Sequence, residues 1–176
     1  MTNFIRMTSL AATVAALAVT TPAVAAPGNT ATPTQQATAT ARVVKPLTIA
    51  WKQDLDLGTI VLGSGVWAGA DVGISSAKAF SCTNTNVTCS GTPKTAEYTV
   101  TGTNNQVVTI NASDVTLTNQ NDNTQTLLLT VDNPGTVNLG NSGAAGLVFD
   151  LGGKVTVAST TVDGTYSGTF AVTVNY

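Results

Sequence analysis

Two carboxylates at alternate positions are the residues of this chain with the clearest capacity for chemistry. Asp54 and Asp56 are separated by one leucine, so in a strand both would lie on one face, roughly 6.5 to 7 Å apart. Paired carboxyl groups at such a separation are what hydrolysis of a glycosidic bond requires. A structural alternative explains the pattern as well, because Leu55 and Leu57 would then face a core while the aspartates face solvent. We favour this alternative and predict that the protein is not an enzyme.

Other catalytic and metal-binding groups are scarce. The sequence contains no histidine, which excludes Ser-His-Asp and Cys-His arrangements and the commonest general base near neutral pH. Asn119, Asn121, Asp122 and Asn123 offer oxygens of the kind that bind calcium, but their spacing matches no recognised calcium loop. An asparagine-rich hairpin loop needs no ion. The sequence therefore predicts no metal and no cofactor.

The two cysteines point to a disulfide. Cys82 and Cys89 are the only cysteines and flank six residues, and in an exported protein an even count favours one bridge. A metal pair is the alternative, but two thiols without histidine make a poor ligand set. A loop this short gains about 2 to 3 kcal/mol at best. We expect the bridge to pin a local loop rather than to hold the domain together.

The two tryptophans are candidates for stacking on a saccharide. Trp51 continues the apolar alternation of Leu47 and Ile49, so we expect it to be buried. Trp67 lies among Gly63, Gly65 and Gly69, where a core position and an exposed one are both open. Trp67 is therefore the candidate ligand-stacking residue.

The first 25 residues are typical of a secretory signal. Arg6 supplies the basic region, Met7–Val19 a short apolar run, and Ala23-Val24-Ala25 a small-x-small cleavage site. The apolar run is too short for a membrane helix, which needs roughly 20 apolar residues. A flexible leader over residues 26–36 and one domain over residues 37–176 are expected to follow.

Charge and composition limit the classes of partner. Without Arg6, six basic residues remain against nine acidic ones, a net charge of about −3. Since they form no basic patch, we expect no nucleic-acid partner. Because no later apolar run approaches the roughly 20 residues that a membrane helix needs, we also expect no membrane span. Charged residues make up 9% of the chain, whereas Thr, Val, Ala, Asn and Gly dominate. This composition favours strands over helices.

Short alternating segments separated by turn residues predict an all-β fold. Alternation begins over Ala37–Val43, is interrupted by Pro46, and resumes at Leu47. Further apolar faces recur along the chain, at residues 54–61, 96–100, 115–117, 127–131, 147–151 and 155–157. The predicted turns are Asn104-Asn105, Asp132–Gly135, Gly152-Gly153 and Asp163-Gly164. Roughly nine strands at this spacing favour an antiparallel two-sheet sandwich, with a closed barrel as the alternative.

The clearest alternation closes the chain. Phe170, Val172, Val174 and Tyr176 alternate with small or polar residues, the two-residue period of a strand with one buried face. We expect this closing strand to complete the core or to take part in assembly.

Three segments, in order, carry a resemblance to a known family. They are residues 41–49 (ARVVKPLTI), residues 56–61 (DLGTIV), and the close formed by residues 152–157 (GGKVTV) and 164–176 (GTYSGTFAVTVNY). Together they resemble the secreted bacterial domain-of-unknown-function family 4402. The closing strand is also similar to those of spore-coat-U-type and other chaperone-usher pilus subunits. That second resemblance implies an immunoglobulin-like, pilin-like sandwich that is completed by a strand from a neighbouring subunit.

The resemblance leads to an expectation about function. We expect an exported, non-enzymatic structural or adhesive protein of a Gram-negative bacterium, a pilin-like fimbrial subunit located in the periplasm, at the cell surface or outside the cell. Its implied partners are like subunits and a periplasmic chaperone and usher. The donor strand would come from Ala37–Val43, which alternates, unless that segment is the domain's own first strand. The alternative function is a monomeric carbohydrate-binding module whose partner is a glycan.

Overall fold

A computed structural model describes residues 35–141 and 145–176 of the chain. The export signal predicted over residues 1–25 and most of the leader predicted over residues 26–36 lie outside the described residues. Residues from Ala41 to Tyr176 form one compact unit. Its described part contains strands and no helix, with antiparallel pairing throughout. The all-β prediction is therefore confirmed, with thirteen strands described where roughly nine were expected.

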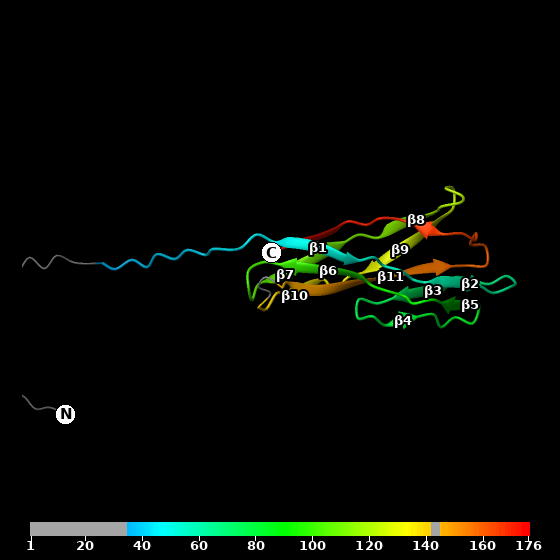
Figure 1. Ribbon diagram of the computed structural model, residues 1–176, viewed down its shortest axis with the longest axis horizontal. Helices are drawn as coiled ribbons and strands as arrows, with labels where there is room; N and C mark the ends of the chain where they lie inside the picture. The colour runs from blue at the N-terminus through cyan, green and yellow to red at the C-terminus, as the bar shows by residue number, and fades with distance from the viewer. Residues whose placement is uncertain (1–34, 142–144) are drawn as a thin grey trace, which may run out of the picture. The chain divides into compact units, whose positions relative to one another are not determined.

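One layer is an eight-stranded antiparallel sheet (Figure 1). Its strands are β1 (Thr48–Gln53), β3 (Ala70–Ile74), β4 (Phe80–Ser81), β6 (Ala96–Thr101), β8 (Val115–Asn119), β9 (Thr126–Asp132), β11 (Leu147–Val157) and β12 (Tyr166–Ser167). The central strand is β11, which pairs with β6 along its first half and with β3 and β9 along its second half. β1 lies at one edge of this sheet, beside β6.

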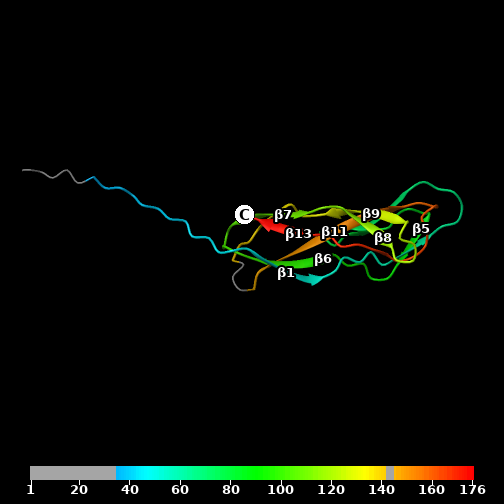
Figure 2. The ribbon, with the colours of Figure 1, turned by 90° about the horizontal axis from the view of Figure 1, so that it is seen from above.

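The other layer consists of two smaller sheets. One contains β7 (Val107–Ala112), β10 (Thr136–Asn138) and β13 (Val172–Asn175), in the order β10-β7-β13. The second pairs β2 (Thr59–Leu62) with β5 (Val87–Ser90). Figure 2 shows β7 and β13 in one layer and β1 and β6 in the other. The arrangement is a sandwich with one continuous layer and one divided layer.

The core is divided in the same way. The first cluster of buried side chains, under β7 and β13, contains Ala96, Val100, Val108, Ile110, Leu139, Phe149 and Leu151. The second, near β2 and β5, contains Ala70, Val72, Val87, Leu129, Val155 and Val157. Leu55, Val131 and Phe170 pack against both clusters. These three half-buried residues therefore join the two parts of the core.

The prediction of a turn at Gly152-Gly153 is wrong. Both glycines lie inside β11, where Gly152 pairs with Asp132 and Gly153 with Val131. A Cβ atom at Gly152 would overlap the backbone of Ile74 and Ser75, and one at Gly153 would crowd Leu129. The two glycines allow neighbouring backbone and core side chains to approach closely, a second use of glycine within strands.

The closing segment crosses from one layer to the other. Tyr166 and Ser167 pair with β8, whereas Val172–Asn175 pair with β7. The partner residues 109–112 and 118–119 belong to consecutive strands, so the closing segment runs antiparallel to both. Between the two pairings the register shifts by one residue. The predicted closing strand is therefore real, but only Val172–Asn175 and the short β12 have strand pairing.

The strand predicted over Ala37–Val43 is not formed. Residues 35–46 are outside any strand and exposed. The apolar positions of the predicted strand are mostly alanines, which offer little apolar surface, and Pro46 has no N–H for sheet pairing. Lys45 is nevertheless fixed: its N–H donates to Thr103 Oγ1 at 2.6 Å, and its carbonyl oxygen accepts from the Tyr176 hydroxyl at 2.6 Å. The segment before β1 thus lies beside the end of β13.

Candidate functional site

A groove of about 1050 Å³ lies between two segments that are far apart in the sequence. One wall is formed by Asp54–Leu62 and the other by Thr161–Phe170. The remaining lining residues are Ala96, Tyr98, Leu117, Leu127, Leu129, Val155 and Val157. Most of these are apolar side chains on the inner face of the large sheet. The groove therefore reaches down to the sandwich interior, although its lining residues Ala96, Leu129, Val155 and Val157 are only 1 to 3% exposed.

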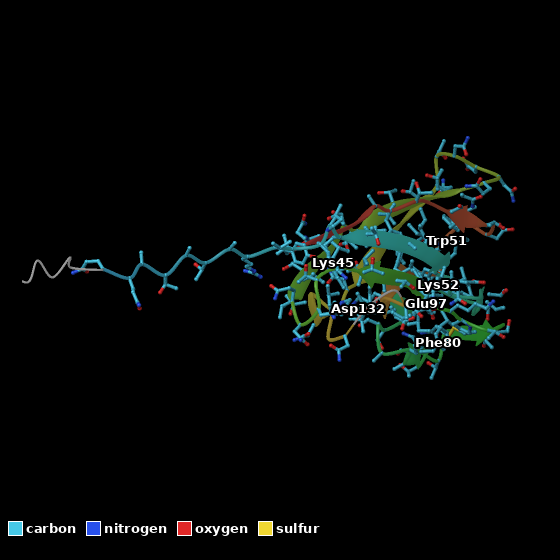
Figure 3. All side chains as sticks on the ribbon, turned by 60° about the vertical axis from the view of Figure 1, so that its left-hand side comes forward. Lys45, Trp51, Lys52, Phe80, Glu97 and Asp132 are labelled. Carbon is cyan, nitrogen blue, oxygen red and sulfur yellow. A yellow bond between two sulfur atoms is a disulfide. The ribbon has the colours of Figure 1, made fainter. Side chains whose placement is uncertain are left out.

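The inner face of β1 is also uncovered. Ile49 lies opposite Val100, and Trp51 lies opposite Tyr98, so both β1 residues point to the core side of the sheet. Val100 is 0% exposed, but Ile49 is 39% exposed and Trp51 is 61% exposed. The expectation that Trp51 is buried is wrong, because the second layer ends at β13 and covers β6 but not the edge strand. Figure 3 shows Trp51 on β1, with Lys52 and Glu97 nearby.

Trp51 is held in place from the side of the groove. Its indole Nε1 donates to Asp54 Oδ1 at 3.1 Å. Its cross-strand neighbour Tyr98 stacks on Phe149, with ring centroids 5.7 Å apart and an interplanar angle of 18°. Burial, and to a lesser degree the negative charge of Asp54, raises the pKa of the Tyr98 phenol above its ordinary value of 10.0. Trp51, Tyr98 and Phe149 thus form an aromatic row across three strands.

The aspartates proposed for hydrolysis line this groove, but they have structural partners. Asp56 Oδ1 accepts from the Gly58 N–H at 2.8 Å, and the Asp56 backbone pairs with Lys94. Asp54 accepts from Trp51. Leu55 and Leu57 are half-buried and pack on the core, whereas both aspartates are exposed. This alternation agrees with the structural explanation of the pair.

The groove is acidic at its rim. Asp54, Asp56 and Asp163 are among its lining residues, and the described lining contains no lysine or arginine. A strand or ligand that enters the groove therefore meets an apolar floor with carboxylates beside it.

Trp67 occupies a different kind of position. It is half-buried and packs against the second core cluster, and its Nε1 donates to the Gly63 carbonyl oxygen at 3.1 Å. Its backbone N–H also donates to Ser159 Oγ at 3.3 Å. Trp67 thus fixes the segment after β2, and the more exposed indole belongs to Trp51.

The predicted disulfide between Cys82 and Cys89 is present. Cys82 directly follows β4, and Cys89 lies in β5 opposite Ile60 of β2. Because β2 forms part of one groove wall and pairs only with β5 among the described strands, the bridge ties that wall to the large sheet through β4 and β3. The disulfide therefore connects two sheets, whereas we had expected it to fix only a local loop.

Three of the four closing-strand residues pack inward. Phe170, Val172 and Val174 are half-buried against the first core cluster, whereas Tyr176 is 49% exposed and uses its hydroxyl instead. The Tyr176 oxygen accepts from the Thr103 N–H at 2.8 Å and donates to the Lys45 carbonyl oxygen. Phe170 also lines the groove, so the closing segment belongs to both core and site.

Side-chain oxygens in the asparagine-rich loop, residues 119–124, accept hydrogen bonds from neighbouring residues. Asn119 is 0% exposed; its Oδ1 accepts from the Asn121 N–H at 2.9 Å, and its Nδ2 donates to the Asp163 carbonyl oxygen at 2.9 Å. Thr124 donates to the Asp122 carboxylate through both its backbone and its hydroxyl, which lowers the pKa of Asp122. These contacts engage side-chain oxygens of Asn119 and Asp122, two of the four residues that had suggested calcium.

Comparison with known proteins gives one match. The sequence model of DUF4402, a domain of unknown function, matches residues 47–176. No curated protein and no solved structure matches the chain. In the part of the chain that the structure describes, no helix is long and apolar enough to cross a membrane.

Proposed function

Since the chain belongs to the DUF4402 family, we propose that it is an exported, non-enzymatic structural or adhesive protein whose sandwich is completed by a strand from a partner. The proposal extends to a pilin-like subunit of a Gram-negative cell surface. The predicted signal over residues 1–25 supports export, and the disulfide suits an oxidising compartment.

The observation that carries the proposal is the uncovered inner face of β1. A sandwich normally covers the core side of each strand with its second sheet, but here 61% of Trp51 remains exposed on that side. An added strand next to β13 would continue the sheet β10-β7-β13 and cover this face. Adding a strand to a free edge supplies backbone hydrogen bonds for affinity and side-chain pockets for specificity.

An unpaired edge strand of a β-sheet promotes aggregation unless it is protected or pairs with a partner strand. Exposed apolar edge strands pair readily with other chains, and proteins usually protect them with charges, proline or short length. β13 has β7 on one side and no described strand on the other. An edge of this kind is expected in a protein that assembles through strand addition.

Purified mature protein tests the proposal directly. A strand-complemented assembly should form ladders that resist SDS at room temperature and collapse on boiling, or should require a co-expressed periplasmic chaperone for solubility. A protein that stays monomeric and soluble at high concentration, without a chaperone, would contradict assembly through strand addition.

The exposed Trp51 also favours a second candidate, a carbohydrate-binding module. An aromatic face beside a carboxylate such as Asp54 is a common arrangement for binding a sugar ring, and these two side chains are hydrogen bonded. A glycan that quenches or shifts tryptophan fluorescence of a monomer, and loses this effect in Trp51→Ala, would favour the binding module over the assembling subunit.

A further inference from the structure

We propose that two copies of this chain dimerise by antiparallel pairing of their β1 edges, about a two-fold axis that passes beside Ile49. The inference goes beyond the proposed function and does not depend on it. The contact lies in the plane of the eight-stranded sheet, where β1 is the edge strand. The strand addition proposed above takes place next to β13, in the other layer.

The strand β1 is exposed along nearly its whole length. Residues 48–52 are exposed, and only Gln53 is half-buried. β1 pairs with β6 on one side and with no described strand on the other. The pairing with β6 is regular from Thr48 to Trp51, and the bulge that often protects an edge comes only after Trp51. The strand therefore has a regular free edge of the kind that pairs readily with another chain.

Symmetry and the inner face of β1 determine the register of the pairing. A two-fold axis perpendicular to the sheet keeps the inner faces of both copies on the same side, and it places one residue opposite its own equivalent. With the axis beside Ile49, residues 47–51 of each copy pair with residues 51–47 of the other, and the bulge after Trp51 stays outside the paired region. Ile49 then lies opposite Ile49 of the second copy, and Trp51 lies opposite Leu47 of the second copy.

This register covers the exposed indole of Trp51. Residues directly opposite each other in an antiparallel pair have Cβ atoms about 4.5 to 5.5 Å apart, so Trp51 of each copy contacts Leu47 of the other. Leu47 lies next to the end of β13, since a Cβ atom at Gly102 would be 2.8 Å from both Leu47 Cδ2 and the Tyr176 hydroxyl. The second layer of one copy thus ends where the indole of the other arrives. A side chain that is 61% exposed in a single copy gains an apolar neighbour in the dimer.

The charges on either side of β1 are self-complementary in an antiparallel pair. Arg42 and Lys45 precede the strand, whereas Asp54 and Asp56 follow it; Figure 3 shows Lys45 and Trp51 toward opposite ends of β1. Antiparallel pairing brings the basic end of each copy beside the acidic end of the other, twice in one dimer. With the axis beside Ile49, Arg42 is in register with Asp56 of the second copy. Parallel pairing would place like charges together, so electrostatics favours the antiparallel arrangement.

A contact in which both copies use the same surface is isologous, and it closes after two copies. The β1 pairing joins the two eight-stranded sheets into one continuous sheet across the axis. The predicted assembly through this edge is therefore a symmetric dimer that does not grow further.

Opposite charges at the axis test the inference in the full chain. Ile49→Lys places two ammonium groups opposite each other in the dimer, and Ile49→Asp places two carboxylates there. Ile49 is 39% exposed, so either side chain can reach solvent in a single copy. Each variant alone should dimerise at least about tenfold more weakly than the unmodified protein. An equimolar mixture should form heterodimers, because lysine then faces aspartate. Light scattering after size exclusion, at a series of concentrations, gives the masses.

Leu128→Lys is the matched control. It adds the same charge at another exposed apolar residue, 58% exposed on β9, and should dimerise as the unmodified protein does. Circular dichroism verifies that both Ile49 variants remain folded. Arg42→Glu should weaken the dimer about two- to fivefold, and high salt should reduce the difference because it screens exposed charges.

Three results would overturn the inference: an unmodified protein that is monomeric at every concentration, Ile49 variants that dimerise as the unmodified protein does, or folded variants that stay monomeric when mixed. The SDS-resistant ladders report separately on the proposed function. Ladders that persist in Ile49→Lys while the dimer is lost would support two distinct contacts. Loss of dimer and ladders together would place Ile49 under the added strand, and the separate two-fold contact would be wrong.

Discussion

The hydroxyl of Tyr176 donates a hydrogen bond of 2.6 Å to the carbonyl oxygen of Lys45, 131 residues earlier in the sequence. The Tyr176 hydroxyl oxygen also accepts a hydrogen bond from the Thr103 N–H at 2.8 Å. One side chain therefore connects β13 with the turn after β6 and with the segment before β1.

Removing this hydroxyl should weaken the fold by a measurable amount. In Tyr176→Phe the Lys45 carbonyl and the Thr103 N–H lose a partner, at a cost of about 1 to 2 kcal/mol. Urea unfolding measures the change. Tyr166→Phe is the control, because the Tyr166 hydroxyl donates only to Val162 O, four residues away, and should cost less. Equal losses would contradict the importance of the Tyr176 contacts.

Gly152→Ala should be strongly destabilising. Its new Cβ would overlap the backbone of Ile74 and Ser75, which cannot move without disturbing the pairing of β3 with β11. We expect a loss of about 3 kcal/mol or more. Gly69→Ala provides the comparison: its Cβ would meet mainly the Thr156 methyl carbon, which can move only if the hydrogen bond from Thr156 to Asp71 is weakened, so the loss should be smaller, about 1 to 2 kcal/mol. A mild effect at Gly152 would show that the close approach is unimportant.

Substitutions at two neighbouring positions in β13 should change the free energy of unfolding by very different amounts. Val172→Asp puts a charge against the first core cluster, where it has no partner, and should cost at least about 3 kcal/mol. Thr173→Lys adds a charge on the exposed face and should change stability by less than about 0.5 kcal/mol. Thermal unfolding of the two variants provides the test. Similar losses would mean that β13 has no buried face.

Loss of the disulfide should loosen the groove wall without unfolding the domain. Replacing Cys82 and Cys89 by serine should cost about 2 kcal/mol, and β2 and β5 should show faster amide hydrogen exchange than β6 and β11. Adding a reductant should lower the melting temperature of the unmodified protein but not that of the double variant. Complete unfolding of the double variant would show that the bridge holds the whole domain.

Tyr98 should make stability sensitive to alkaline pH. Its pKa is raised in the folded state, so the unfolded state loses its proton first. The contribution from Tyr98 is present below pH 10.0 and is lost as pH rises through the folded-state pKa. Tyr98→Phe should therefore flatten the fall in stability above pH 10, and urea unfolding at several alkaline pH values measures the change. An unchanged alkaline profile in Tyr98→Phe would contradict the burial of the phenol.

Local patterns predicted about half of the strands and missed β3, β4, β5, β7, β10 and β12. Period-two alternation placed β6, β8 and β9 correctly, and the turns at Asn104-Asn105 and Asp132–Gly135 are where turn chemistry favours them. The failure at Gly152-Gly153 has a physical cause. Glycine permits a turn and a close approach between strands equally well, and only the position of Ile74 decides between them. Ile74 is 78 residues away in the sequence.

The site was less predictable than the strands. Alternation correctly put Trp51 on the inner face of β1, but burial also requires something to cover that face. Whether β13 covers the edge strand β1 depends on where the closing segment crosses between the layers, near Gly168. The residues around Trp51 in the sequence carry no information about that crossing. The groove likewise combines Asp54–Leu62 with Thr161–Phe170, segments whose proximity follows from topology alone.

The place of β11 in the chain has a consequence for the timing of folding. β3, β6 and β9 all precede it, and each pairs with it. When the chain emerges from its N-terminus into the compartment where it folds, the earlier strands arrive before their common partner. During this interval their apolar faces have no central strand on which to pack. Folding to the native sheet must therefore await residues 147–157, and whatever protects the nascent chain from aggregation must act until that moment.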